Sequence, residues 1–107
     1  MSYTHIPMQV LAEKLNALSE SDLILDVRGR DEYAAGHIPG SLNIPHDELL
    51  QHLDLLRQYK HIYIHCKSGG RSGFASDVLF KMGLTHVTCI SGSGMPEWIA
   101  AGLPVAK

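Results

Sequence analysis

Runs typical of buried β-strands alternate with helical patterns along the whole of this chain of 107 residues. The run Leu23–Val27 is nearly continuously apolar, as expected for a strand covered on both faces. Further strands are predicted at Tyr3–Ile6, Leu42–Ile44, Ile62–His65 and His86–Ile90. Because strands that alternate with helices usually pair in parallel, the pattern predicts an α/β fold. Its three layers, α/β/α, would surround a central, mainly parallel sheet of about five strands.

Helices are predicted between these strands, because apolar residues there recur every three or four positions. The stripes expected to face the sheet are Met8, Leu11, Leu15 and Leu18; Leu49, Leu53 and Leu56; and Phe74, Ala75, Val78, Leu79 and Met82. Asp31 is expected to cap a short helix that ends at Gly36, and Gly83 to follow the helix over Ser72–Met82. A short final helix is expected over Pro96–Ala101.

The length and composition predict one domain over residues 1–107, with no requirement for disulfides. The formal net charge of −2 gives no basic field that would recruit nucleic acid or anionic membranes. No apolar run reaches the roughly 20 residues that span a bilayer, and the N-terminus lacks signal-peptide features. Two cysteines, Cys66 and Cys89, do not make a disulfide framework. We therefore expect a cytoplasmic protein with reduced thiols.

The segment His65–Ser72 lies where a predicted strand ends and a predicted helix begins. A helix N-terminus exposes unpaired N–H groups and carries partial positive charge, so such a turn can hold an anion. Its two glycines permit positive φ angles, and Lys67 and Arg71 add positive charge. A thiol in this place should ionise easily, whereas an ordinary thiol is only about 3% thiolate at pH 7. We interpret Cys66 as a nucleophile in an anion cradle, and we expect the residues of that cradle, Lys67, Ser68, Gly69, Gly70, Arg71 and Ser72, to bind the substrate.

The other candidate side chains are assigned to structural roles. Cys89 lies inside a strand with neither glycine nor cation beside it, so we expect it to pack in the core. Neighbours along a strand point to opposite faces, so His65 should bond to nearby backbone and not act as a base for Cys66. His37 is expected to fix the turn Gly36–Gly40. The histidines show no metal-ligand spacing, and no metal or cofactor is expected.

Three segments should meet at one edge of the sheet, because the carboxyl ends of parallel strands lie together. These are Asp26–Arg28, the loop after Cys66 and the glycine-rich turn Ser91–Met95. Asp26 is expected to be buried and hydrogen-bonded, for example to an arginine. Trp98 is expected to be a core residue of the last helix.

Four motifs in the same order give the chain a resemblance to the rhodanese-like sulfurtransferases. They are Asp26-Val27-Arg28 with Glu32-Tyr33; Gly36-His37-Ile38-Pro39-Gly40-Ser41 with Asn43-Ile44-Pro45; Cys66 to Arg71; and Trp98 with Ala101-Gly102-Leu103-Pro104-Val105. The resemblance implies that Cys66 accepts a sulfane sulfur as a persulfide, and that the loop amides and Arg71 hold the donor. It places Asp26 and Arg28 in support of the pocket. Ser93 stands where the family often has glycine, so the resemblance does not predict the detailed structure of the pocket wall.

The sequence thus predicts a sulfurtransferase that moves sulfur from thiosulfate or a similar donor to cyanide or a thiol. Thiosulfate is favoured because Lys67 and Arg71 place two cations on the loop, which suits a dianion. One alternative is a persulfide carrier that docks on a partner, such as a thioredoxin-like protein or a desulfurase. A cysteine-dependent phosphatase is a minor alternative. Those enzymes have one more residue than this chain between the cysteine and the arginine, and no acid loop is evident here.

Overall fold

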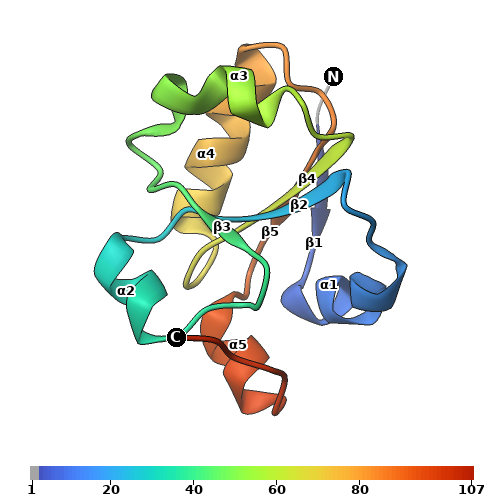
Figure 1. Cartoon of the computed structure of the whole chain (residues 1–107), viewed down its shortest axis with the longest axis vertical. Coiled ribbons are helices and arrows are strands. Elements are labelled where there is room, and N and C mark those ends of the chain that lie inside the picture. The colour runs from blue at the N-terminus through green and yellow to red at the C-terminus, as the bar shows by residue number, and fades with distance from the viewer. Residues whose placement is uncertain (1–2) are drawn as a thin grey trace.

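A parallel sheet runs through the centre of the molecule (Figure 1). Within residues 3–107, which the computed structural model describes, five strands pair in the order β1-β5-β4-β2-β3, and all four pairings are parallel. The strands are β1 (Thr4–Ile6), β2 (Asp22–Asp26), β3 (Leu42–Asn43), β4 (His61–His65) and β5 (Val87–Ile90). The central position of β4 puts the end of this strand, and hence Cys66, in the middle of one edge of the sheet.

Helices cover both faces of the sheet, with α3 and α4 on one side and α1 and α5 on the other (Figure 1). The helices are α1 (Met8–Lys14), α2 (Arg30–Ala35), α3 (Leu53–Leu56), α4 (Gly70–Lys81) and α5 (Met95–Ala100), with 3₁₀ turns η1 (Leu15–Ala17) and η2 (Leu49–His52). The predicted three-layer α/β/α fold is therefore confirmed. The stripe at Leu49, Leu53 and Leu56 is split between η2 and α3, and α4 begins two residues earlier than predicted.

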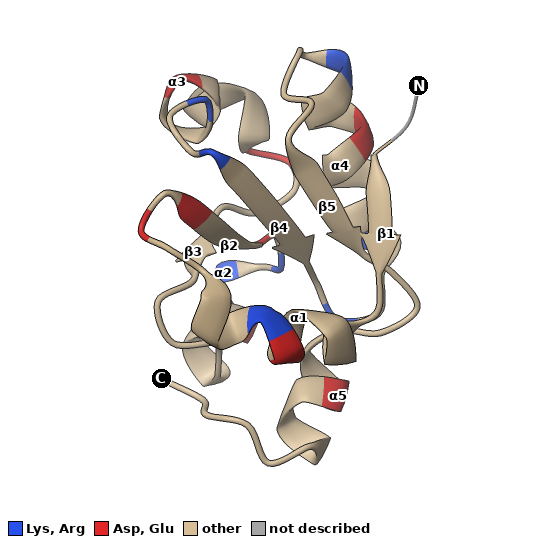
Figure 2. Cartoon of the chain, turned by 90° about the vertical axis from the view of Figure 1, so that its right-hand side faces the viewer, with Lys and Arg blue, Asp and Glu red and all other residues tan. Residues whose placement is uncertain are grey.

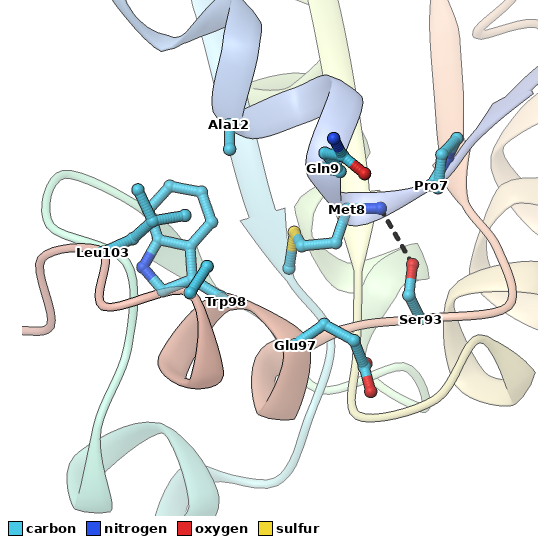
Figure 3. A pocket seen from close by; sticks show the side chains of 9 residues that line it. Pro7, Met8, Gln9, Ala12, Ser93, Glu97, Trp98 and Leu103 are labelled. Atoms are coloured by element: carbon cyan, nitrogen blue, oxygen red, sulfur yellow. Dashed lines mark hydrogen bonds between the residues drawn. The ribbon is translucent and has the colours of Figure 1, made fainter.

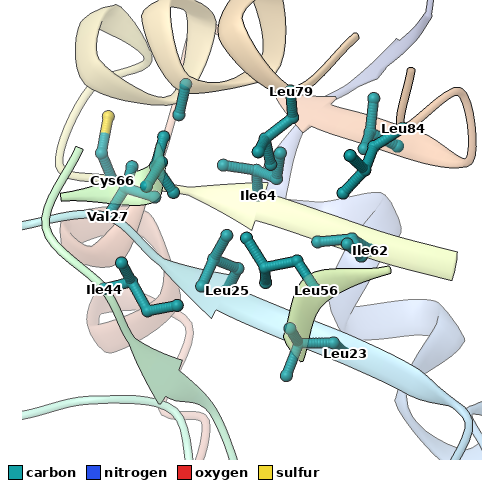
Figure 4. Close-up of a cluster of buried hydrophobic side chains, with 13 residues drawn as sticks. Leu23, Leu25, Val27, Ile44, Leu56, Ile62, Ile64, Cys66, Leu79 and Leu84 are labelled. Carbon is teal, nitrogen blue, oxygen red and sulfur yellow. The ribbon is translucent and has the colours of Figure 1, made fainter. Parts of the chain in front are cut away.

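Two clusters of buried side chains fill the spaces between the layers. The cluster under α3 and α4 includes Leu25, Val27, Ile64, Leu79 and Cys66, and Figure 4 shows Cys66 at one end of it. The cluster on the other face consists of Met8, Leu11, Ile24, Ile38, Ile90, Met95 and Trp98. Trp98 is fully buried, as predicted, and its indole N–H donates to the Pro104 carbonyl over 2.8 Å.

The predicted apolar face of α4 is wrong at two positions. Phe74 is 55% exposed and Met82 is 42% exposed. The helix instead presents Ser72, Ala75, Ser76 and Leu79 to the sheet. The two serines tolerate burial because their hydroxyls donate to backbone carbonyls, Ser72 to Ile90 over 2.8 Å and Ser76 to Ser72 over 2.7 Å. A prediction from hydrophobicity alone therefore selects the wrong face of α4 as the buried one.

Glycines end or begin several of these elements. Gly83 follows α4 with a φ of 92°, as predicted for a residue after a helix C-terminus. The predicted cap of α2 is wrong, because Gly29 takes that position and Asp31 lies inside the first turn. The Gly29 N–H donates to the Glu32 carboxylate over 2.9 Å, so a side chain in the first turn of α2 bonds back to the cap residue.

Charged residues of both signs are interspersed over the helices and loops in Figure 2, in keeping with the small net charge. Among the helices of residues 3–107, none is long and apolar enough to cross a membrane.

Candidate active site

Cys66 follows the last residue of β4 and lies three residues before the end of the loop that leads into α4. Its side chain is enclosed, with only 1% of the residue surface exposed. The sulfur accepts the N–H of Gly69 over 3.1 Å and the N–H of Ser72 over 3.3 Å, and it lies 3.5 Å from the Ser72 hydroxyl. Two backbone N–H groups of the loop therefore donate to Sγ, which is the arrangement expected of an anion cradle.

Two opposing effects act on the Cys66 thiol. Burial raises its pKa, because the thiolate loses solvation. Hydrogen bonds from the Ser72 hydroxyl and from the N–H groups of Ser72, Gly69 and Ser68 stabilise the thiolate. The hydrogen bonds outweigh burial, and the pKa of Cys66 is lowered. A lowered pKa is the property expected of a nucleophilic cysteine at neutral pH.

Glycines at two positions allow the loop to close around the sulfur. Gly69 has a φ of 113°, in the left-handed region, and a Cβ there would also lie 3.0 Å from the backbone nitrogen of Gly92. Gly94 is extended, but a Cβ on it would overlap the carbonyl oxygens of Cys66 and Lys67. Gly70, the second glycine that would permit positive φ, does not use it and is the first residue of α4.

The turn after β5 packs directly on the Cys66 loop, as the topology predicted. The Met95 N–H donates to the Cys66 carbonyl over 3.1 Å. Ser93 has no positive φ, so a serine at this position strains nothing. Its hydroxyl instead accepts the Met8 N–H over 2.8 Å at the start of α1 (Figure 3). This bond joins the start of α1 to the turn after β5.

Arg71 has a partner that the sequence reasoning did not anticipate. Its guanidinium donates two hydrogen bonds to the Glu32 carboxylate, with Nη1–Oε1 and Nη2–Oε2 distances of 2.5 and 2.9 Å. The hydrogen bonds from Arg71 hold the pKa of Glu32 at about 2, against the opposing effect of burial and with help from the Gly29 N–H. Arg71, which was predicted to bind the sulfur donor, therefore already has a carboxylate partner at the edge of the loop. The signal available in the sequence was Glu32 itself, which belongs to the first motif but was given no role.

The Asp26–Arg28 pair lies buried under the loop. Arg28 donates through Nε to Asp26 Oδ1 over 3.0 Å and through Nη2 to Oδ2 over 2.7 Å, and Nη2 also reaches the Gly36 carbonyl over 2.7 Å. Asp26 is 0% exposed and Arg28 6%. The expectation of a buried Asp26 bonded to an arginine is confirmed, and the pair connects the end of β2 to the end of α2.

His65 is fully buried, and burial lowers its pKa, so the ring is neutral. Its Nε2 lies 3.8 Å from Asp26 Oδ2. Neither ring nitrogen has a hydrogen-bond partner of good geometry within residues 3–107, and the predicted bond to backbone is represented only by a weak interaction with the Cys66 backbone, which raises the pKa of His65 against the larger effect of burial. The hydrogen bonds of the Cys66 sulfur within residues 3–107 do not include His65, so the structure gives this histidine no contact as a base for Cys66.

Two further sequence expectations are confirmed by packing. Cys89 is fully buried and, like Cys66, is a free cysteine. The His37 ring stacks on Tyr33 at a centroid distance of 3.7 Å, and its Nδ1 lies 2.8 Å from the Tyr33 carbonyl, which fixes the turn after α2. Over the same residues 3–107, no three His, Cys, Asp or Glu side chains gather as a metal site would require.

Three cavities border this end of the sheet. The largest of the three, about 390 Å³, lies between α1 and α5 and is lined by Met8, Ser93 and Trp98 among others (Figure 3). A second, about 240 Å³, is lined by Arg28, Glu32, Lys67, Ala35, Met95, Pro96 and Ile99. A third, about 340 Å³, is lined by Gly29, Arg30, Pro45, His46, Asp47, Glu48 and Arg71. The second and third cavities adjoin the segment around the proposed nucleophile, the second through Lys67 and the third through Arg71.

The sequence of this chain matches the Rhodanese-like domain family over residues 10–101. The chain belongs to the rhodanese-like family. A protein named Sulfurtransferase from Allochromatium vinosum is 31% identical over 100 residues, which cover 94% of this chain and 92% of that protein. The putative sulfur carrier protein YrkF of Bacillus subtilis is 36% identical over 97 residues, covering 91% of this chain and 51% of that protein.

Solved structures give the same result for the rhodanese-like fold. A rhodanese-related protein from Thermoplasma volcanium superposes with a TM-score of 0.81 and 33% identity, over 97% of this chain and 98% of that one. The chain spans only 51–61% of the length of three of the curated relatives that it matches. The activity and partners of those longer proteins therefore enter here only as proposals.

Proposed function

We propose that this rhodanese-like domain transfers sulfane sulfur through a persulfide on Cys66, from an anionic donor of the thiosulfate type to cyanide or a thiol. The observation that carries the proposal is the contact of Sγ with the N–H groups of Gly69 and Ser72, at 3.1 and 3.3 Å. Donors so placed favour negative charge on Cys66 before the reaction and on the persulfide after it. Similarity to proteins named as a sulfurtransferase and a putative sulfur carrier supports the same chemistry.

The proposed reaction has two displacements. The Cys66 thiolate attacks the outer sulfur of thiosulfate, a bond forms between Sγ and that sulfur, and the sulfur–sulfur bond of the donor breaks. Its electron pair leaves with sulfite. A thiolate or cyanide then attacks the outer sulfur of the persulfide, and the electron pair of the broken bond returns to Cys66. Because the sulfur passes through a covalent intermediate, the kinetics should be ping-pong.

The proposed binding set is the loop itself. The backbone N–H groups of Lys67, Ser68, Gly69, Gly70, Arg71 and Ser72 would hold the donor and the persulfide, and the Arg71 guanidinium, which is paired with Glu32, would add positive charge beside them. Asp26 and Arg28 would support the pocket by holding β2 and α2 in place, as their buried hydrogen bonds suggest. The reaction requires no cofactor. The acceptor in the cell would be a small thiol or a thioredoxin-like protein, and a desulfurase would be a partner that supplies sulfur, in a cytoplasmic setting that keeps thiols reduced.

A phosphatase is disfavoured by the same geometry. A phosphoryl group presents three oxyanions to the loop and is commonly met by a guanidinium that binds two of them. Here four residues separate Cys66 from Arg71, and the Arg71 guanidinium is already bound to Glu32. A ring of a few N–H groups that closes on one sulfur atom fits a persulfide better.

The test is the mass of the protein after incubation with thiosulfate under reductant-free conditions. We expect the added mass of one sulfur atom on wild-type protein and on the Cys89→Ser control, and none on Cys66→Ser. An adduct that persists in Cys66→Ser would contradict the proposed nucleophile. Loading without turnover to cyanide would assign a carrier role, and hydrolysis of an aryl phosphate that requires Cys66 would assign a phosphatase.

A further inference from the structure

Helix α4 buries two serines and leaves a phenylalanine exposed. Ser72 and Ser76 face the sheet, whereas Phe74 is 55% exposed. Leu50, on η2, is 62% exposed. Both side chains line one cavity of about 270 Å³, whose other lining residues are His46, Asp47, Leu49 and Val78. We refer to these six residues as the α4 groove. Large apolar side chains that gather on a surface in this way are typical of an interaction site.

The α4 groove leads to the Cys66 loop. Arg71, Phe74 and Val78 follow one another at spacings of three and four residues, so they lie on one side of α4. With a rise of about 1.5 Å per residue, Val78 lies roughly 10 Å from Arg71 along the helix axis. His46 and Asp47 line both the groove and the cavity of about 340 Å³ that Arg71 also lines. An extended chain of about three residues, at roughly 3.3 Å each, covers the same length.

The unpaired charge at the groove is negative. Arg30 is bound to Glu48 over 2.7 Å, and Arg71 is bound to Glu32. Asp47 is exposed, and among the ion pairs of residues 3–107 it takes part in none. An occupant with a lysine or arginine beside an apolar side chain would therefore complement both the carboxylate and the apolar wall.

The size of the groove suits a protein better than a small sulfur compound. Thiosulfate and cyanide can react at Sγ without contact with Phe74, and neither has an apolar group. A protein that exchanges sulfur with Cys66 must bring its own cysteine close to the loop, because Cys66 is only 1% exposed. The surface around that cysteine then covers the side of α4 next to the loop. Aromatic side chains such as Phe74 are enriched in protein–protein interfaces.

We propose that the α4 groove docks a protein acceptor of sulfur, which carries an apolar side chain and a lysine or arginine about three residues from its reactive cysteine. The inference rests on the proposed persulfide on Cys66. In the transfer, the thiolate of the partner forms a bond to the outer sulfur of the persulfide. The bond between that sulfur and Sγ breaks, and its electron pair stays on Cys66. The partner leaves with the persulfide, and Cys66 is again a thiolate.

The test uses short peptide thiols with blocked ends as probes. The reference probe is Cys-Gly-Gly-Leu-Lys, and the probes Cys-Gly-Gly-Ala-Lys and Cys-Gly-Gly-Leu-Glu each change one position. All three are also made in reverse order, so that both chain directions are tested. The rate constant for sulfur removal from Cys66, persulfidated with thiosulfate, is measured by rapid quench and mass spectrometry. It is divided by the rate constant of the same peptide with glutathione persulfide, which removes differences in intrinsic reactivity.

We expect the reference probe, in its faster chain direction, to exceed both other probes by about fivefold on wild-type protein. Phe74→Ala should remove most of the preference for leucine over alanine, because apolar contact is lost. Met82→Ala is the matched control and should leave this preference unchanged, because it truncates a 42% exposed methionine at the far end of α4. Asp47→Lys should reverse the preference for lysine over glutamate. Sulfur removal by 2-mercaptoethanol should stay the same in all three variants, because a small thiol does not use the groove.

The outcomes distinguish this inference from the function on which it rests. If Cys66 takes up sulfur but the three probes react alike, or the variants leave their preferences unchanged, the inferred docking surface is wrong and the sulfur transfer stands. A wild-type dimer in sedimentation velocity that dissociates in Phe74→Ala, with equal rates for the probes, would assign the groove to a second copy of this chain and overturn the inference. If Cys66 takes up no sulfur, the proposed sulfur transfer itself is refuted, and the inference with it.

Discussion

Gly94 offers a sharp test of how the Cys66 loop is held. Its backbone is extended, a conformation that any residue adopts, so conformational strain plays no part in a change to alanine. The added Cβ would overlap the carbonyl oxygens of Cys66 and Lys67. Because both contacts are with backbone, no side chain can rotate out of the way, and the loop itself must move.

The expected loss of stability follows from these contacts. Overpacking in a closed site costs about 1–3 kcal/mol, and contact with backbone places Gly94→Ala at the upper end. Displacement of the loop would also weaken the 3.1 Å bond between Met95 N–H and the Cys66 carbonyl, which is worth about 1 kcal/mol. We expect the free energy of unfolding, measured in urea, to fall by about 3–4 kcal/mol.

Displacement of the loop in Gly94→Ala should also change the ionisation of the Cys66 thiol. Sγ depends on N–H groups of Gly69 and Ser72, so a displaced loop should raise the pKa of Cys66. The assay is the rate of alkylation by iodoacetamide as a function of pH, with Cys66→Ser to subtract other sites.

The matched control for Gly94→Ala is Gly73→Ala, a glycine in α4 where a Cβ would meet nothing within 4 Å. Alanine there should stabilise the helix by about 0.5–1 kcal/mol. A Gly94→Ala protein as stable as wild type, with an unchanged pH profile, would refute the packing argument.

Three further predictions concern the polar groups at this edge of the sheet. Asp26→Ala leaves the buried Arg28 charge unpaired and should lower the free energy of unfolding, measured in urea, by about 3–5 kcal/mol. The loss should exceed that of an exposed control, Asp54→Ala, and equally small losses in both variants would contradict the prediction. Ser72→Ala removes the hydroxyl 3.5 Å from the sulfur, which can donate to the thiolate when it turns away from the Ile90 carbonyl, so the alkylation profile of Cys66 should shift to higher pH. A profile that stays in place would show that the hydroxyl is not used. Because the folded pKa of Glu32 is depressed to about 2 from 4.5, its ion pair stabilises the protein above pH 4.5 and the contribution is lost as pH falls toward 2. The side chain is 37% exposed, so the loss should be under about 1 kcal/mol; it should be absent in Glu32→Gln, and an identical acid titration of both proteins would contradict the prediction.

The fold was predictable because its main signals are local. The apolar run that forms β2 and the alternation of strands with helices already imply a parallel sheet between helices. The face of α4 was mispredicted because the serines at 72 and 76 are buried through bonds to backbone, while Phe74 is exposed and contacts His46 edge-on at 5.7 Å. Hydrophobicity gives no information about such bonds.

The position of the candidate site could be predicted from the sequence, but the pairing of its charged side chains could not. Cys66, the glycines and the helix start are contiguous in the sequence, so the anion cradle can be inferred from local chemistry. The Glu32–Arg71 pair joins residues 39 positions apart, and their contact depends on how α2 and α4 meet at the edge of the sheet. No local pattern reports that distance, which is why the two cations of the loop looked free in the sequence.

The central claim is that the loop stabilises negative charge on the sulfur of Cys66, and the most direct measurement is the titration of that thiol. The ultraviolet absorbance of the thiolate is followed against pH in wild-type protein, and the curve for Cys66→Ser is subtracted. We predict a transition below the ordinary thiol pKa of about 8.5. A transition at or above that value would show that burial outweighs the N–H donors, and would contradict a nucleophilic Cys66.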